Sequence, residues 1–419
     1  MAAAFAHAWE RLRDGAWLDR RCVGVGAGIL LALQIAAFAF AVAGTHGWIV
    51  RMPKLPTTDF VSFYAAGQLA DAGTPALAYD RTAHFAAEKR VAGPDIGYQF
   101  FNYPPVYILP FAALAGLPYL LAFILFEGAT LGLYLFAACR ILGERSGTAL
   151  AALCAFPIVF WNFGLGQNAF LTAGLFGMAT LFIDRRPVVA GLLFGMLCYK
   201  PQFGVLVPLA LAAGGQWRIL AAAVASAAGL VLLSLVLFGA DTWRDFLQVA
   251  GASQGMYASG RILFGGMANT FGAARLLGAG VPVAYGLQAV ASLVAASAVV
   301  IVWRRRLPLP IRAAMLASAA LVAAPLALLY DLMLGVVAAA WLIRDRASLA
   351  GTAWEKTVMA GLYLVLLDGR LGDRWHVPVL PLAAIALFAL VSARAWREIA
   401  HRRGARDKQS MLAGSGNAA

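Results

Sequence analysis

Residues 23–46 read VGVGAGILLALQIAAFAFAVAGTH, a run of 24 residues without Asp, Glu, Lys or Arg. A helix needs about 20 apolar residues to cross the hydrocarbon core of a bilayer. Comparable runs occupy residues 119–139, 219–238, 280–303 and 376–393. The chain of 419 residues is 62% hydrophobic and 13% charged, whereas soluble domains contain about 25% charged residues. The predicted fold class is therefore an all-α, multi-pass membrane protein.

The first run follows a basic segment that includes Arg20 and Arg21 and ends near Ala41-Val42-Ala43. This pattern resembles a cleavable signal peptide. The apolar part of a signal peptide spans only about 7–15 residues, so we favour a retained anchor helix, with cleavage as the alternative. The four cysteines lie within or at the ends of apolar runs and form no CxxC pair. They are typical of packing residues and do not indicate a disulfide framework.

The positions of the basic residues predict the orientation, because short cytoplasmic loops are enriched in Lys and Arg. An arrangement of twelve crossings with both termini in the cytoplasm places 22 of the 33 Lys and Arg residues inside. The inner segments are then 1–22, 140–147, 184–187, 214–218, 304–312, 344–356 and 394–419. The net charge of +13 follows from this topology and from attraction to anionic membrane lipids. It requires no nucleic-acid partner.

This topology divides the chain into three parts. Residues 1–22 form a cytoplasmic N-terminal segment, and residues 23–395 form the membrane domain, in which 47–104 is the large first outer loop with short helices. Residues 396–419 form a basic cytoplasmic tail, which its composition predicts to be disordered near anionic lipid.

Two stretches, 188–213 and 313–343, could each be one long helix, which would reverse the orientation of all that follows. We therefore predict that each is a pair of short helices meeting near the outer side. A 12-residue helix covers about 18 Å of a hydrocarbon core about 30 Å thick. The polar residues at the meeting points, Lys200-Pro201-Gln202 and Tyr330-Asp331, would then lie at lipid depth. Ionisable groups buried there mark a functional cavity.

Asp59 opens an amphipathic stretch of the first outer loop that runs from Phe60 to Ala72 and ends at Gly73 and Pro75. Asp is among the preferred residues at a helix N-cap, and this role alone would explain its position. A carboxylate held at the outer mouth of a helical bundle could also accept a proton from a hydroxyl group. The two roles are compatible, since both need a fixed side chain.

The same loop closes with Phe100-Phe101-Asn102-Tyr103-Pro104-Pro105. Tandem prolines disfavour helix through Tyr103. The stretch is either a rigid re-entry into the membrane with an interfacial aromatic anchor or one wall of a pocket.

Other predicted outer turns carry amides and cations that suit sugar hydroxyls and phosphate respectively. These residues are Gln167, Asn168, Arg261 and Asn269. A single residue of this kind is more often a helix cap or an interface anchor. A binding site is favoured because all four are predicted to lie on the outer face. The sequence contains no Walker-type loop, HExxH pair or GxSxG elbow, and its five histidines show no metal-ligand spacing.

An ordered set of motifs resembles glycosyltransferase family 87. The motifs are Asp59-Phe-Val-Ser-Phe-Tyr-Ala-Ala-Gly67, Tyr79-Asp80, Phe101-Asn-Tyr103-Pro104-Pro105, Gly166-Gln167-Asn168 and Lys200-Pro201-Gln202. The resemblance implies a C-type glycosyltransferase fold with its active site at the outer, periplasmic face of the cell membrane. It also implies a sugar donor linked to polyprenyl phosphate and a lipid or envelope-glycan acceptor.

In this family the carboxylate after the first membrane helix is the proposed base, and it corresponds to Asp59. The mannosyltransferase branch carries a histidine near the late outer turn, where this chain reads Ala324-Pro325-Leu-Ala-Leu-Leu-Tyr330-Asp331. The resemblance therefore leaves open whether the sugar is mannose or another hexose or pentose.

We expect Asp59 to act as general base and Lys200, with Arg261 as second choice, to bind the donor phosphate. The candidates for sugar or acceptor contacts are Tyr64, Tyr103, Gln167, Asn168, Gln202, Asn269, Tyr330 and Asp331. Asp331 could instead assist Asp59, hold a divalent cation or pair with Lys200. No cofactor is indicated by a motif, and a divalent cation is left open.

Two other functions compete with sugar transfer. A transporter or flippase of a lipid-linked glycan would place a charged site near mid-membrane and often contains inverted repeats, which we do not find. A structural membrane subunit would leave Asp59, Lys200 and Asp331 unexplained.

Overall fold

The computed structural model describes residues 2–43, 58–260, 262–345, 353–369 and 371–416. Within these ranges every regular element is a helix, and one isolated antiparallel bridge joins Met267 to Leu328. Arg261 and residues 47–57 of the first outer loop lie outside the described residues.

Five helices are long and apolar enough to cross a membrane. They are α2 (Arg20–Ala43), α6 (Tyr119–Leu142), α13 (Trp217–Ala258), α15 (Val281–Arg304) and α21 (Val379–Gly416). The helices α7 (Gly147–Cys154) and α8 (Pro157–Leu165) meet at 54° and would add a sixth span if they count as one. The chain is thus a multi-pass helical membrane protein, as its composition predicts.

The predicted count of twelve crossings is not supported, because the remaining apolar helices are short. They are α5 (Ile108–Leu114), α9 (Ala169–Phe182), α10 (Pro187–Gly195), α11 (Pro201–Gly204), α12 (Leu206–Ala213), α16 (Leu309–Ala323) and α17 (Met333–Arg344). At 1.5 Å per residue, even the 15-residue α16 covers only about 22 Å of a core about 30 Å thick. By length, none of these short helices spans the bilayer by itself.

The prediction of broken helices at 188–213 and 313–343 is confirmed. In the first stretch, α10 passes into the 3₁₀ turn η3 (Met196–Tyr199), and the chain breaks at Lys200 before α11 and α12. Pro201 begins α11, where its fixed φ and missing N–H are tolerated. In the second, residues 324–328 and the 3₁₀ turn η5 (Leu329–Leu332) separate α16 from α17.

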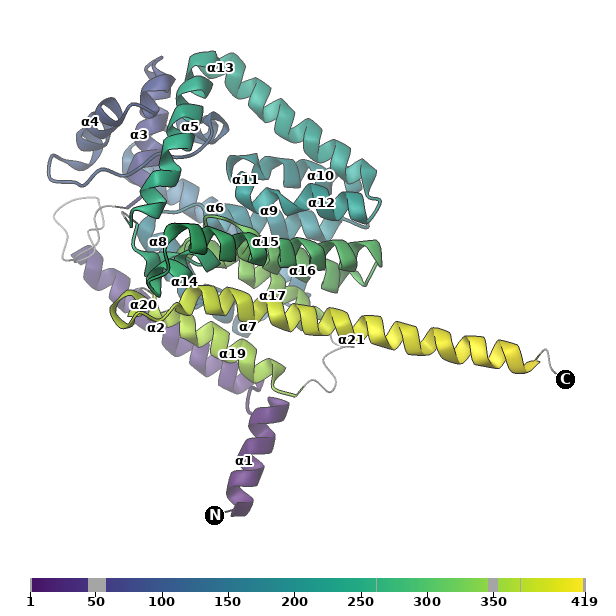
Figure 1. The fold of residues 1–419 in the computed structure, drawn as a ribbon. Coiled ribbons are helices and arrows are strands. Elements are labelled where there is room, and N and C mark those ends of the chain that lie inside the picture. The colour runs from purple at the N-terminus through teal and green to yellow at the C-terminus, as the bar shows by residue number, and fades with distance from the viewer. Residues whose placement is uncertain (1, 44–57, 261, 346–352, 370, 417–419) are drawn as a thin grey trace.

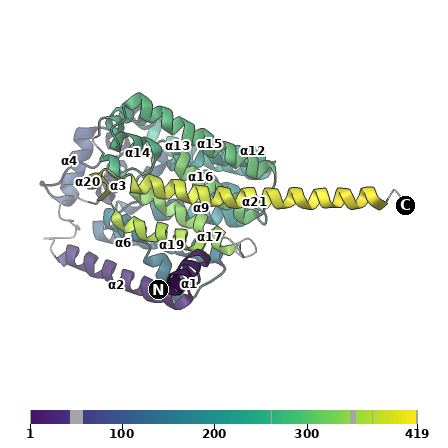
Figure 2. The same ribbon diagram turned by 60° about the horizontal axis from the view of Figure 1, so that its bottom comes forward.

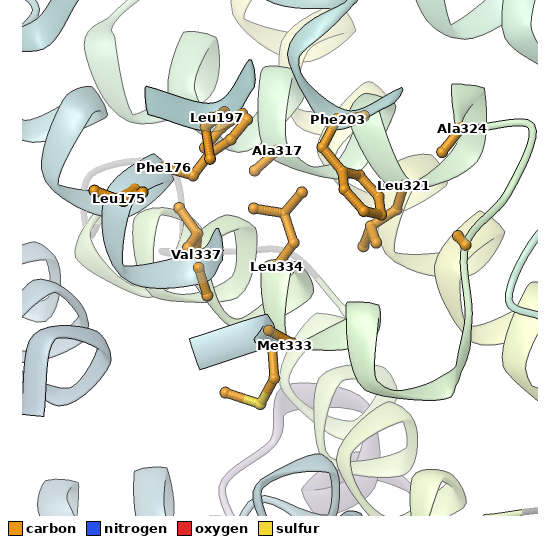
Figure 3. Close-up of a cluster of buried hydrophobic side chains, with 14 of the residues drawn as sticks. Leu175, Phe176, Leu197, Phe203, Ala317, Leu321, Ala324, Met333, Leu334 and Val337 are labelled. Atoms are coloured by element: carbon orange, nitrogen blue, oxygen red, sulfur yellow. The ribbon is translucent and has the colours of Figure 1, made fainter. Parts of the chain in front are cut away.

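The hydrophobic core lies between these broken helices (Figure 3). Phe176 of α9 and Leu197 of η3 approach Ala317 of α16, while Leu334 and Val337 of α17 close the other side. Side chains at these positions are almost fully buried. Close packing of this core fixes where the two breaks in the backbone lie relative to each other.

The outer-loop helices gather at one end of the molecule. They are α3 (Phe60–Asp71), η1 (Pro75–Ala78), α4 (Arg81–Ala92) and η2 (Pro105–Tyr107). In Figure 1 and Figure 2, α3, α4 and the short α20 (Leu371–Trp375) lie at the end opposite the C-terminus of α21. Helix α21 continues to Gly416, whereas composition predicts a disordered tail. Five alanines and four arginines among residues 396–419 favour helix continuation.

Helix α13 bends where Gly239 adopts φ +80° and ψ 165°, a conformation outside the helical region (Figure 1). Glycine reaches this region without the steric penalty of a Cβ atom. Beyond the bend, α13 packs against η1 and η2 of the outer loop, with the rings of Phe246 and Tyr79 5.7 Å apart. The second half of α13 therefore supports the loop that carries Asp59.

The remaining helices complete the bundle. They are α1 (Ala2–Asp14), η4 (Phe264–Gly266), α14 (Thr270–Leu276), α19 (Glu355–Val365) and η6 (Leu366–Asp368). Ion pairs join the turns away from the outer loop: Arg312 pairs with Asp184 at 3.0 Å, and the buried Arg394 pairs with Glu355. The first pair joins the start of α16 to the turn after α9, and the second joins the first residue of α19 to the middle of α21.

Candidate active site

Asp59 immediately precedes α3, as predicted, but its carboxylate does not cap the helix. Its Oδ2 atom accepts a hydrogen bond of 2.7 Å from Nε2 of Gln167, 108 residues away. The backbone N–H of Asp59 donates to the carbonyl of Leu165 at 2.6 Å. The half-buried carboxylate is thus held against the turn between α8 and α9, and capping does not explain its position.

The turn between α8 and α9 is built around the fully buried Asn162. Its Nδ2 donates to the carbonyl of Gln167 at 2.8 Å, and its Oδ1 accepts from the N–H of Ala169 at 3.0 Å. The same Nδ2 lies 3.4 Å from Oε2 of Glu127 in α6. A chain of contacts therefore runs from Glu127 through Asn162 to Gln167 and Asp59.

Glu127 and Asn162 were not among the residues predicted for the site. A signal for Glu127 existed, since it is an ionisable residue inside a 24-residue apolar helix and such residues are costly in a membrane. Asn162 carried no such signal, because an amide near a helix end is ordinarily a cap. Its role depends on contacts that only the folded chain brings together.

Gly166 allows the turn to approach α3. Its φ is +65°, and a Cβ atom at this position would lie 2.6 Å from Cβ of Phe60. We expect Gly166→Ala to lower the free energy of unfolding by about 1–3 kcal/mol for the left-handed backbone and by a further 1–3 kcal/mol or so for overpacking.

Gly143→Ala is the matched control for this prediction, since Gly143 has φ +72° but open space where its Cβ would lie. Thermal unfolding of the two variants in detergent isolates the clash with Phe60. Equal losses of stability in both variants would contradict a close approach of the turn to α3.

Tyr103 connects Asp59 to the buried lysine. Its hydroxyl donates to Oε1 of Gln167 at 3.3 Å, and Nζ of Lys200 lies 6.0 Å from its ring centroid. Gln167 therefore binds Asp59 with one end of its amide and Tyr103 with the other. We call Asp59, Tyr103, Gln167, Lys200 and Asp331 the Tyr103 cluster.

Lys200 and Asp331 form a buried ion pair at the two breaks in the broken helices. Nζ of Lys200 donates to Oδ1 of Asp331 at 2.7 Å, and the two side chains are 3% and 4% exposed. Oδ2 of Asp331 accepts from the N–H of Leu328 at 2.9 Å. The sequence left several roles open for Asp331. The structure shows it paired with Lys200.

Aromatic rings enclose the lysine. Nζ of Lys200 lies 5.0 Å from the ring centroid of Tyr330 and 5.8 Å from that of Phe203. Cations at such distances are attracted to the faces of aromatic rings, more strongly when water is excluded. One of the three ammonium hydrogens is committed to Asp331.

Several other predicted residues have different surroundings. The hydroxyl of Tyr64 donates to the carbonyl of Leu117 at 2.6 Å, on the side of α3 that faces Tyr119. Asn269 caps α14 through Gly272 and donates to the carbonyl of Pro325 at 2.6 Å, so its amide is engaged within the protein.

Asn168 and Gln202 remain near the cluster, as neighbours in sequence of Gln167 and Lys200. Asn168 is fully buried, and Gln202 is half-buried in α11. Arg261 lies outside the described residues. Among the residues that the structure describes, no group of three or more His, Cys, Asp or Glu side chains could hold a metal ion.

A buried His84–Glu88 pair supports α3 from the α4 side. Nε2 of His84 lies 3.0 Å from the carbonyl of Ser62, and Nδ1 lies 3.6 Å from Oε1 of Glu88. Oε2 of Glu88 accepts from the N–H of Gln99 at 3.1 Å. Burial lowers the pKa of His84 to about 4 and raises the pKa of Glu88 to about 8, with a smaller contribution from Asp59 to the latter.

These pKa values predict how stability depends on pH. The contribution of Glu88 is present below its unfolded pKa of about 4.5 and is lost as pH rises through 8. The contribution of His84 is complete above its unfolded pKa of about 6.5. Below pH 6.5 the contributions of His84 and Glu88 to stability change in opposite directions with pH. Above pH 6.5 only the contribution of Glu88 changes, so the unfolding temperature is expected to fall as pH rises from 6.5 to 8.

Thermal unfolding of wild type and Glu88→Gln across this range tests the assignment. The variant is expected to show a flatter profile, because Gln does not ionise. Parallel profiles for the two proteins would show that another group titrates.

The fold and the cluster define a class of protein: a multi-pass helical membrane protein with polar and ionisable groups gathered at breaks in its helices. A family model for glycosyltransferase family 87 matches residues 100–330. The chain belongs to this family and is a membrane glycosyltransferase.

The matched range contains Tyr103, Gln167 and Lys200, whereas Asp59 and Asp331 lie outside it. Neither the curated proteins nor the solved structures contain a match to this chain. The resemblance found in the sequence motifs is thus confirmed at the level of the family.

Proposed function

We propose that this protein transfers a hexose or pentose, mannose being the first candidate, from a polyprenyl-phosphate donor to a lipid or envelope-glycan acceptor. The observation that carries the proposal is the Tyr103 cluster, in which the hydroxyl of Tyr103 is linked through Gln167 to the half-buried Asp59 carboxylate while its ring lies near the buried Lys200 ammonium group. Sugar transfer from a phosphate needs both a base for the acceptor and a partner for the leaving group.

Asp59 is the general base in this proposal. The acceptor hydroxyl attacks the anomeric carbon and loses its proton to the Asp59 carboxylate, while the bond between that carbon and the phosphate oxygen breaks. The leaving phosphate keeps the electron pair. Gln167 supports this role, because its 2.7 Å hydrogen bond fixes the direction of the carboxylate. A positioned base contributes about 10²–10⁴-fold to such a reaction.

Lys200 is proposed to contact the leaving phosphate. Asp331 makes the pair neutral overall and takes one ammonium hydrogen, so the remaining hydrogens would supply directed hydrogen bonds and not a net positive charge. Preorganised donors in a water-excluded site stabilise developing negative charge more than they do in water. Arg261 remains the second choice, and Tyr330, Asn168 and Gln202 remain candidates for sugar contacts.

The proposed active site faces the outer, periplasmic side of the cell membrane, with both termini in the cytoplasm. The distribution of Lys and Arg supports this orientation. So does the position of α3 and α4 at the end opposite the C-terminus (Figure 1). A C-type glycosyltransferase fold is part of the same proposal.

Reconstitution of the full-length protein in liposomes tests the function. With polyprenyl-phosphate mannose and an extracted membrane lipid acceptor in the same outer compartment, we expect a mass-shifted glycolipid by mass spectrometry. Other polyprenyl-phosphate sugars, supplied singly, define the donor. Movement of the donor across the bilayer without any glycolipid product would instead identify a flippase.

A further inference from the structure

Helix α1 carries an exposed apolar stripe. Phe5, Trp9 and Leu12 follow one another at spacings of four and three residues, so they lie on one face of the helix. Their exposed fractions are 72%, 52% and 39%, and the rings of Phe5 and Trp9 stack with centroids 6.4 Å apart. The exposed His7 and Asp14 fall on the opposite face. A continuous apolar stripe of this kind marks an interaction surface.

Three contacts hold α1 against the start of α19. The N–H of Trp354 donates to the carbonyl of Arg13, and the hydroxyl of Thr357 donates to the carbonyl of Leu12 at 2.6 Å. The rings of Trp9 and Trp354 meet edge to face with centroids 4.8 Å apart. Two of these contacts are made to the backbone of α1, so the direction in which the stripe faces is fixed relative to α19.

The start of α19 is joined to the charged end of a candidate membrane span. Glu355, the first residue of α19, forms an ion pair with Arg394 of α21. Residues 379–393 of α21 contain no Asp, Glu, Lys or Arg, so Arg394 is the first charged residue after this apolar part of the span. In the same way, Arg20 at the start of α2 pairs at 3.4 Å with Glu144, which follows α6. These contacts place α1 level with the charged ends of three candidate spans.

The axis of α1 runs across the direction of the spans. In both Figure 1 and Figure 2, α15 and α21 share one direction, and α1 lies across it without continuing the line of α2. Gly15, with φ +64°, follows α1, and only residues 15–19 separate α1 from α2. A linker of five residues spans at most about 18 Å. Helix α1 is therefore kept close to the end of α2 and parallel to the plane of a bilayer.

We propose that α1 is an interfacial helix that inserts its apolar stripe into the lipid of one leaflet. This is the leaflet at the level of Arg20 and Arg394, which is the cytoplasmic one in the proposed orientation. The stripe contacts acyl chains just below the headgroups, where aromatic residues are enriched, and the opposite face contacts water. A helix with aromatic and aliphatic residues on one face and charges on the other is typical of this mode of binding. The proposal does not depend on sugar transfer, so either proposal can fail alone.

Spin labels on the two faces of α1 test this proposal in the full-length protein. The four cysteines are first replaced by alanine, and a label is attached in Phe5→Cys or in His7→Cys, its matched control two residues away on the opposite face. The proteins are placed in nanodiscs of phosphatidylcholine and phosphatidylglycerol. Electron paramagnetic resonance then measures collisions with oxygen, which concentrates in lipid, and with a nickel chelate, which stays in water. We expect the label in Phe5→Cys to collide mainly with oxygen and the label in His7→Cys mainly with the nickel chelate.

Two results would overturn the proposal. Equal exposure of both labels to the nickel chelate would show that α1 lies in water. Protection of the label in Phe5→Cys from both reagents would show that protein, and not lipid, covers the stripe. Dipolar broadening between labels at this position would then identify the covering protein as a second copy of the chain.

A label in Leu12→Cys tests whether insertion depends on the stripe itself. Adding Phe5→Ser should raise the water-exposed fraction of this label by about tenfold, because the burial of one phenylalanine side chain in lipid is lost. Adding His7→Ser instead should leave that fraction unchanged. An unchanged fraction in the Phe5→Ser variant would contradict insertion of the stripe.

Discussion

Replacing Asp59 with Asn is expected to lower the rate of sugar transfer by about 10²–10⁴-fold while leaving the fold intact. Asn has nearly the same size, and its side-chain oxygen can still accept the hydrogen bond that Gln167 donates to Oδ2 of Asp59. What the variant lacks is a group that can take up a proton. Initial rates with reconstituted protein, together with the unfolding temperature in detergent, measure the two properties separately.

Asp80→Asn is the control for this substitution. Asp80 lies in the same outer loop and caps α4 by accepting from the N–H of Ala83 at 2.8 Å. Asn and Asp are nearly equivalent as N-caps, so neither stability nor transfer should change appreciably. If Asp59→Asn retains the wild-type rate, the base is a different residue, whatever the identity of the sugar.

Lys200→Met is expected to destabilise the protein by about 3–5 kcal/mol, because it leaves a buried carboxylate without its partner. The pair is 2.7 Å apart and almost fully buried. The double variant Lys200→Met/Asp331→Leu should recover most of this stability, since a buried pair can often be replaced by apolar residues without net loss. It should remain inactive if Lys200 contacts the leaving phosphate.

An exposed pair with the same separation provides the comparison. Arg244 and Asp241 are also 2.7 Å apart, but their side chains are 67% and 77% exposed. Arg244→Met should therefore change stability by less than about 1 kcal/mol. Full activity in the double variant would exclude Lys200 from catalysis, and unchanged stability in Lys200→Met would show that the pair is hydrated in the folded protein.

The features that could be predicted from the sequence are those that depend on neighbouring residues alone. Charge placement, with the cost of an ionisable residue at lipid depth, indicated breaks near Lys200 and Asp331, and both breaks are present. The start of a helix after Asp59 followed from its flanking residues in the same way. Each of these inferences required only neighbouring residues and the thickness of a bilayer.

The sequence did not predict features that depend on contacts across the chain. The role of Gln167 depends on a partner 108 residues away, and Glu127 joins the site through Asn162, 35 residues further on. The count of crossings failed for a related reason: apolar composition shows that α9 or α16 is buried, but burial by protein and burial by lipid look alike in sequence. Tyr64 was predicted to contact the sugar or the acceptor, but it lines a cavity that contains no member of the Tyr103 cluster.

The Lys200–Asp331 pair also constrains how the protein can be made. The partners are 131 residues apart, and at about 5–20 residues per second the ribosome needs on the order of ten seconds to travel between them. During that interval the broken helix at 188–213 contains Lys200 but lacks its counterion, Asp331. We therefore expect the broken stretch 188–213 to reach a stable arrangement only after the stretch 313–343 has been translated, and we expect neither half to assemble when expressed alone.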